Sequence, residues 1–143
     1  MKRLASAWFI ASLLAANPTL AEVGTYSAEY HACVARTGGD DDKRIACIET
    51  ETDRQDAALN AAYARLMRRL SEFQKQRLRF SERAWLQYRD AECAFQSSIN
   101  IGGPPGIVAR AERDARVECI LRETSLRVDA LKTSYGRSWD GFS

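Results

Sequence analysis

Ala84–Cys93, with the sequence AWLQYRDAEC, is the stretch that decides the fold. It contains a Trp, a Tyr, an Arg-Asp pair and a Cys but no Gly or Pro, so it predicts a helix. Residues four apart lie on one helical face, which places Trp85, Arg89 and Cys93 together. An Arg between a Trp and a Cys is expected to be half buried and to need a carboxylate partner. We therefore interpret Arg89 and Asp90 as internal ion-pair partners that fix helix packing.

The preceding segment, Lys43–Leu70, is also predicted to be helical because apolar residues recur at helical steps without an intervening Gly or Pro. Glu51 and Asp56 on this helix are the first candidates to contact Arg89. These two carboxylates could instead perform acid–base catalysis, but the sequence supplies no nucleophile or second oriented group beside them. Asn60 and Tyr63 are interpreted as inter-helix hydrogen bonding and core packing rather than as a ligand site.

The two remaining helices complete an all-α bundle of one short helix followed by three longer antiparallel helices. The short helix is predicted over Tyr26–Arg36, and the last one over Val108–Thr133. The acidic run Asp40–Asp42 favours capping of the second helix. Its other interpretation, a calcium loop, lacks the alternating ligands of an EF-hand.

The third helix, reaching to about Ser97, also has an expected start signal and an expected end signal. Ser71 followed by Gln74 fits a capping box, although one continuous helix through Ser71 remains an alternative. After it, Ile99–Ile107 is predicted to be irregular because it holds three Gly and two Pro. Within the helix, a second apolar stripe adjoins the Trp85 face at steps of three and four residues: Phe80, Ala84, Tyr88, Ala91 and Phe95.

The first 21 residues have the pattern of a secretory signal peptide. Lys2 and Arg3 precede an apolar run over Leu4–Ala16, which is too short to span a bilayer comfortably. Cleavage is predicted before Glu22, which leaves a helical domain over residues 22–133 and a poorly ordered tail over 134–143. The predicted location is periplasmic or secreted, with no stable membrane anchor after cleavage.

Four Cys in an exported chain of this size imply two disulfides. In an antiparallel hairpin, positions symmetric about the turn face each other. This symmetry favours Cys33–Cys47 about Asp40, and Cys93–Cys119 about Gly106. The competing interpretation is a four-Cys zinc site with His31 nearby. The Cys spacing does not support it, and export disfavours free thiolates.

The charge balance and the missing motifs exclude several classes of function. The chain has 21 Lys and Arg against 19 Asp and Glu, and loss of Lys2 and Arg3 makes the two counts equal. A neutral mature domain has no electrostatic basis for binding nucleic acid. No P-loop, dinucleotide-binding glycine motif or catalytic triad is present, so we expect neither an enzyme nor a bound cofactor or metal.

The motifs resemble the lysozyme inhibitor LprI-like N-terminal domain family over about Tyr30–Leu131. One set follows the family spacing C-x3-E-x4-D-x2-L-N-x2-Y: Cys47, Glu51, Asp56, Leu59, Asn60 and Tyr63. A second set lies around the opening motif: Leu78, Arg79, Arg83, Ala84, Trp85, Arg89, Asp90 and Cys93. The family more often has Ala-Gln where this chain has Ser81-Glu82, which affects local surface chemistry rather than the fold.

The resemblance implies a binding protein that inhibits a lysozyme or a similar muramidase. The alternative is a periplasmic adaptor or immunity-type protein that binds another partner and does not inhibit lysozyme. For the partner-binding element, we expect the loop residues Asn100, Gly102 and Gly103 together with Arg110. A rigid loop beside a cation would suit a cleft that holds two carboxylates. The exposed face of the third helix is the rival surface.

Overall fold

The computed structural model describes residues 25–99 and 102–134. Four α-helices and a π-helical turn account for most of them: α1 (Ala28–Ala35), α2 (Asp41–Met67), α3 (Glu72–Ser98), α4 (Pro105–Asp129) and η1 (Ala130–Ser134). This part of the chain contains no strand, and the all-α prediction is confirmed. The predicted signal peptide lies outside the described residues, as do residues 135–143 of the predicted tail.

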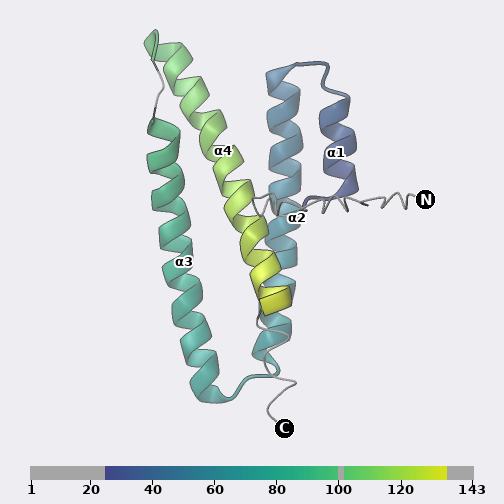
Figure 1. The fold of residues 1–143 in the computed structure, drawn as a ribbon, viewed down its shortest axis with the longest axis vertical. Helices are drawn as coiled ribbons and strands as arrows, with labels where there is room; N and C mark the ends of the chain where they lie inside the picture. Colours follow the sequence, from purple (N-terminus) through teal and green to yellow (C-terminus); the bar gives the residue numbers. More distant parts are fainter. Residues whose placement is uncertain (1–24, 100–101, 135–143) are drawn as a thin grey trace, which may run out of the picture.

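The helices form two antiparallel hairpins that lie side by side (Figure 1). α1 packs against the first half of α2, and α3 packs against α4. The hairpins meet mainly where α4 lies against α2. As a result, α2 has neighbours on two sides, whereas α3 lies at the edge of the bundle with α4 as its main neighbour.

Both predicted disulfides are present. Cys33–Cys47 joins α1 to α2 with the Cα atoms 5.8 Å apart, and Cys93–Cys119 joins α3 to α4 with the Cα atoms 5.4 Å apart. All four thiols are therefore bonded, and the zinc interpretation is wrong. Each bridge crosslinks the two helices of a hairpin, which restricts the unfolded chain and stabilises the fold.

Local sequence signals explain where α2 and α3 begin. The carboxylate of Asp40 accepts a hydrogen bond from the Lys43 N–H at 3.0 Å, so the acidic run caps α2 as predicted. Gly39, just before it, has a φ of 85°, a value that glycine adopts without strain. At α3, Ser71 and Gln74 form the reciprocal bonds of a capping box, which confirms that α2 and α3 are separate helices.

The start of α4 differs from the prediction. Helix begins at Pro105, so the last three residues of the expected irregular loop, Pro105–Ile107, are helical. Proline is well suited to the first helical position, because it has no N–H to leave unpaired there and its φ is preset. At the other end, the regular α-helix ends at Asp129, and η1 completes the predicted segment.

Two apolar clusters hold the helices together. The larger one joins α2, α3, α4 and η1 through Leu59, Ala62, Leu66, Leu78, Val128 and Leu131. Trp85 and Tyr63 pack against its edge. The smaller one, under α1, contains Ile45, Ile48 and Leu121. α3 contributes only Leu78 to these clusters, so most of its surface faces away from the core.

Candidate protein-binding site

The opening motif forms a contact between α3 and α4. The guanidinium carbon of Arg89 lies 5.2 Å from the centroid of the Trp85 ring, a cation–π distance. Its Nε and Nη2 atoms donate to a carboxylate oxygen of Asp90 at 3.0 and 2.9 Å. Nη1 donates to the Thr124 hydroxyl of α4 at 3.4 Å. These contacts use the polar atoms of Arg89 within the fold, so they position helices rather than a ligand.

The prediction that Glu51 contacts Arg89 is wrong. Glu51 is 1% exposed, and its carboxylate accepts hydrogen bonds from the Ser27 N–H at 2.9 Å, the Ser27 hydroxyl at 2.5 Å and the Gln55 amide at 2.8 Å. The chain entering α1 passes over α2 and brings the two Ser27 donors to the carboxylate, whereas Gln55 lies one turn further along α2. Burial alone would raise the pKa of Glu51, but the hydrogen bonds from Ser27 and Gln55 outweigh it and hold the pKa below its ordinary value.

Asp56 also forms no ion pair with Arg89, whose ion pair among the described residues is with Asp90. Asp90 is the next residue on the same helix and reaches the guanidinium first. The positive charge of Arg89 still acts on Asp56 from a distance. Burial raises the pKa of Asp56, and the attraction of Arg89 only partly offsets that rise. The two predicted carboxylates therefore have different surroundings, because Glu51 is hydrogen-bonded to Ser27 and Gln55 and neither carboxylate pairs with Arg89.

A second ion pair in this region was missed by sequence reasoning. Arg127 of α4 donates to Glu82 of α3 at 2.8 and 3.2 Å, and the two side chains are only 10% and 15% exposed. The Arg127 guanidinium carbon also lies 5.6 Å from the Trp85 ring centroid. The available signal was Glu82 itself, an acidic residue one turn before Trp85 on the same helical face. Of the other motif residues, Asn60 is exposed and Tyr63 is half-buried against the core.

The end of the α3–α4 hairpin has a different character. We call Ile99, Gly102–Ile107 and Arg110 the α3–α4 tip; Asn100, which was predicted to belong to it, lies outside the described residues. The tip lies at one end of the molecule, opposite the turn between α2 and α3 (Figure 1). Ile99 is 42% exposed and Ile107 64% exposed. Gly102 and Gly103 face open space, because a Cβ atom at either position would meet nothing within 4 Å.

Arg110 connects the tip to the rest of the fold. Its guanidinium pairs with the Asp42 carboxylate in the first turn of α2. The Arg110 side chain is 52% exposed and the Asp42 side chain 71% exposed. An ion pair this exposed to water contributes little to stability. Arg110 is therefore held near the tip but can exchange Asp42 for another carboxylate at little cost.

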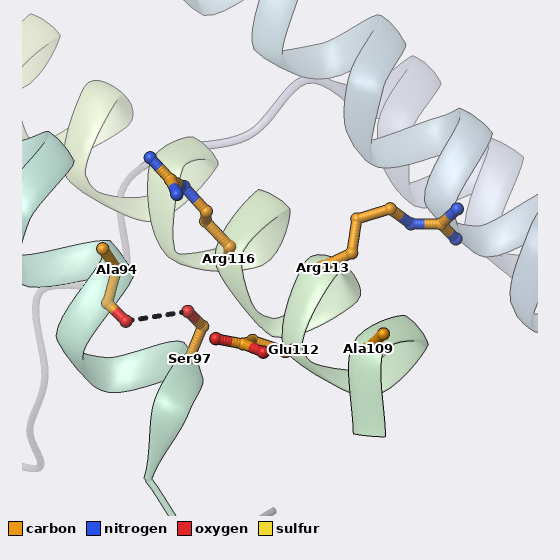
Figure 2. A pocket seen from close by; sticks show the side chains of 6 residues that line it. All are labelled: Ala94, Ser97, Ala109, Glu112, Arg113 and Arg116. Atoms are coloured by element: carbon orange, nitrogen blue, oxygen red, sulfur yellow. Dashed lines mark hydrogen bonds between the residues drawn. The ribbon is translucent and has the colours of Figure 1, made fainter. Parts of the chain in front are cut away.

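A shallow depression of about 340 Å³ lies beside the tip, between the end of α3 and the first half of α4 (Figure 2). It is lined by Ala94, Ser97, Ala109, Glu112, Arg113 and Arg116. The Ser97 hydroxyl donates to the Ala94 carbonyl at 3.0 Å, so it is satisfied within α3. Arg113 pairs with Asp114, and Arg116 is exposed. Together with Arg110, these cations recur every third residue along α4, a spacing that could have identified this surface from the sequence.

The described residues include no group of three or more His, Cys, Asp or Glu side chains that could hold a metal ion. None of their helices has both the length and the apolar composition that crossing a membrane requires. No curated protein and no solved structure matches the chain. The model of one family, the lysozyme inhibitor LprI family, matches residues 27–131 and so covers every helix from α1 to α4. The chain therefore belongs to the lysozyme inhibitor LprI family.

Proposed function

We propose that this chain is an exported protein that binds and inhibits a lysozyme or a similar muramidase. The family match over residues 27–131 supports inhibition, and two formed disulfides favour an oxidising compartment outside the cytoplasm. The observation that carries the proposal in this structure is the α3–α4 tip. It combines an exposed glycine loop, an exposed Ile on each side and a cation that is only weakly held.

The chemistry of the target explains why such a tip would inhibit. A glycoside hydrolase cleaves its substrate between two carboxyl groups that face a cleft. The guanidinium of Arg110 is a planar cation that can form two parallel hydrogen bonds with one carboxylate. When the tip enters the cleft, Arg110 leaves Asp42 and pairs with a catalytic carboxylate, while Ile99 and Ile107 fill apolar sugar-binding surface. Substrate and tip then compete for the same space.

The fold reduces the entropy that binding would otherwise cost. Cys93–Cys119 joins α3 and α4 behind the tip, so the loop is presented by two crosslinked helices. A binding element that is ordered before contact loses less conformational freedom in the complex. The cations beside the depression, Arg113 and Arg116, would face acidic groups at the rim of the cleft and increase the rate of association.

The proposal is tested by measuring lysis of bacterial cell walls by lysozyme with increasing amounts of the oxidised mature chain. Gly102→Glu is the most informative variant, because the position is open and the new carboxylate would face the two carboxylates of the target. We expect the wild-type chain to inhibit in a dose-dependent manner and Gly102→Glu to lose inhibition. Thermal unfolding of both proteins should coincide, which shows that the fold is intact.

A matched pair of variants isolates the cation. Arg110→Ala and Asp42→Asn both break the same ion pair, but only Arg110→Ala removes the positive charge. Arg110→Ala should weaken inhibition at least about tenfold, whereas Asp42→Asn should inhibit as well as the wild type or better. Full inhibition by Gly102→Glu and Arg110→Ala would contradict a role for the tip. Absence of inhibition by the wild-type chain would contradict the proposed function itself.

A further inference from the structure

An exposed apolar stripe runs along α3 on the side away from the core. Among the described residues, seven large hydrophobic side chains are exposed, and six of them lie on α3 or at its C-cap. The stripe consists of Phe73, Phe80, Ala84, Tyr88, Ala91 and Phe95, all of which are exposed. The four aromatic side chains in it are 55–66% exposed. α3 is therefore apolar on two faces, and the bundle covers only one of them.

The spacing of the stripe defines a single surface. At about 100° per residue its members fall within an arc of about 80°, roughly opposite the buried residues Leu78 and Cys93. From Phe73 to Phe95 it extends over about 33 Å at 1.5 Å per residue. Arg77 interrupts this surface between Phe73 and Phe80, but the remainder is apolar, and an exposed apolar patch of this size is typical of a site of association.

The four aromatic residues of the stripe are placed symmetrically about Ala84, whereas Ala91 has Arg77 as its counterpart. Phe80 and Tyr88 lie four residues on either side of it, and Phe73 and Phe95 lie eleven residues on either side. A helix with this pattern is complementary to an antiparallel copy of itself, because a two-fold axis through Ala84 places each aromatic residue against another. Such self-complementarity is what a two-fold dimer interface requires.

We propose that the stripe is covered by α3 of a second copy of this chain, in an antiparallel two-fold dimer. Phe80 of one copy packs against Tyr88 of the other, and Phe73 packs against Phe95. Ala84 meets Ala84 at the axis, where its small side chain lets the helices approach closely. The proposal concerns a surface separate from the α3–α4 tip and goes beyond the proposed function.

Charge complementarity supports the same arrangement. Arg77 is exposed within the stripe, between Phe73 and Phe80, and its guanidinium carbon lies 5.1 Å from the Phe73 ring centroid. Glu92 lies at one edge of the stripe, toward the other end of the helix, where its carboxylate accepts a hydrogen bond from the Gln96 amide at 2.7 Å. In the antiparallel dimer Arg77 of each copy lies beside Glu92 of the other, so two ion pairs flank the aromatic contacts. A parallel arrangement would instead place Arg77 beside Arg77.

The area reaches the lower limit of a specific interface. Two copies bring eight aromatic side chains, each more than half exposed in the single chain, or about 1,000 Å² of surface before the neighbouring residues are included. Specific interfaces begin at about this size. Because the helices run antiparallel, the two α3–α4 tips lie at opposite ends of the dimer and both stay accessible.

Sedimentation equilibrium of the oxidised mature chain, from micromolar to sub-millimolar concentration and without lysozyme, tests the dimer. Ala84→Glu places two carboxylates against each other at the two-fold axis and should weaken the dimer at least about 100-fold. Ala57→Glu makes the same change at an exposed position of α2 and should leave the dimer unchanged. A wild-type chain that stays monomeric throughout, or a dimer that Ala84→Glu does not weaken, would overturn the proposal.

Crosslinking provides a second, positive measurement. A thiol at the axis lies next to its own copy, so Ala84→Cys should form a covalent dimer in high yield under mild oxidation. Ala57→Cys, at the matched position on α2, should not. Equal crosslinking of the two variants would contradict the proposed surface even if a dimer exists. Neither measurement depends on whether the chain inhibits lysozyme.

Discussion

α2 and α3 have the same length, 27 residues, yet α2 buries eight of them and α3 buries three. The difference follows from position, since α2 lies between α1 and α4 whereas α3 packs mainly against α4. The two helices also differ in the kind of side chain that they bury or expose. α2 buries the polar side chains of Glu51 and Gln55, while α3 exposes the aromatic side chains of Phe80 and Tyr88. An apolar stripe on a helix therefore identifies a contact surface, but it does not specify whether the contact lies within the chain or with another molecule.

The largest expected change in the free energy of unfolding comes from comparing one substitution on α2 with one on α3. Ile48 of α2 is 1% exposed and Phe80 of α3 is 66% exposed. Ile48→Ala should lower the free energy of unfolding by about 3 kcal/mol, because it leaves a cavity in the core. Phe80→Ala should change it by less than about 0.5 kcal/mol. Urea unfolding in the Ala84→Glu background measures both without a contribution from self-association, and similar losses for the two variants would contradict the assigned burial.

The next effect concerns the buried carboxylate of α2. The pKa of Glu51 lies below its ordinary value of 4.5, so the charged form stabilises the fold above that pH. This contribution is lost as the pH falls below about 4.5 and through the folded-state pKa. Glu51→Gln should therefore lower the free energy of unfolding by about 2 kcal/mol at neutral pH, with a smaller difference in acid. Urea unfolding of wild type and variant at neutral and acidic pH checks this, and a difference that does not change with pH would argue against a charged Glu51.

A smaller change in stability is expected at the capping box where α3 begins. Ser71 caps α3 by accepting from the Gln74 N–H, and Gln74 accepts in return from the Ser71 N–H. Ser71→Ala should cost about 1 kcal/mol of stability. Ser98→Ala is the control, because this exposed hydroxyl at the other end of α3 bonds only to the Phe95 carbonyl among the described residues. Thermal unfolding should show a clear decrease for the first variant and little change for the second.

Local signals in the sequence predicted the helices, the capping box and both disulfides. The Cys pairs were predicted by symmetry about Asp40 and Gly106, and both form although α4 begins at Pro105, so that Gly106 is helical rather than the centre of the turn. The beginning of α4 at Pro105 was missed, since a segment with several Gly and Pro residues reads as irregular although proline suits the first helical turn.

Contacts between distant residues were the part that sequence could not supply. Glu51 binds Ser27, 24 residues away, and Glu82 binds Arg127, 45 residues away, so neither pairing has a periodic signal. Of the acidic partners expected for Arg89, the adjacent Asp90 forms the ion pair, whereas Glu51 and Asp56 of α2 do not. The sequence also did not show which apolar face of α3 is buried. The two faces have the same helical spacing, and only the arrangement of neighbouring helices decides which one is covered.

Inhibition kinetics of lysozyme on a short soluble oligosaccharide test the central proposal most directly. If the α3–α4 tip enters the cleft, the oxidised chain competes with substrate, so the apparent KM rises with inhibitor concentration while kcat stays constant. The rise should disappear with Gly102→Glu and persist with Asp42→Asn. A fall in kcat at constant KM would place the inhibitor outside the cleft, and unchanged kinetics at concentrations that saturate binding would contradict inhibition through the tip.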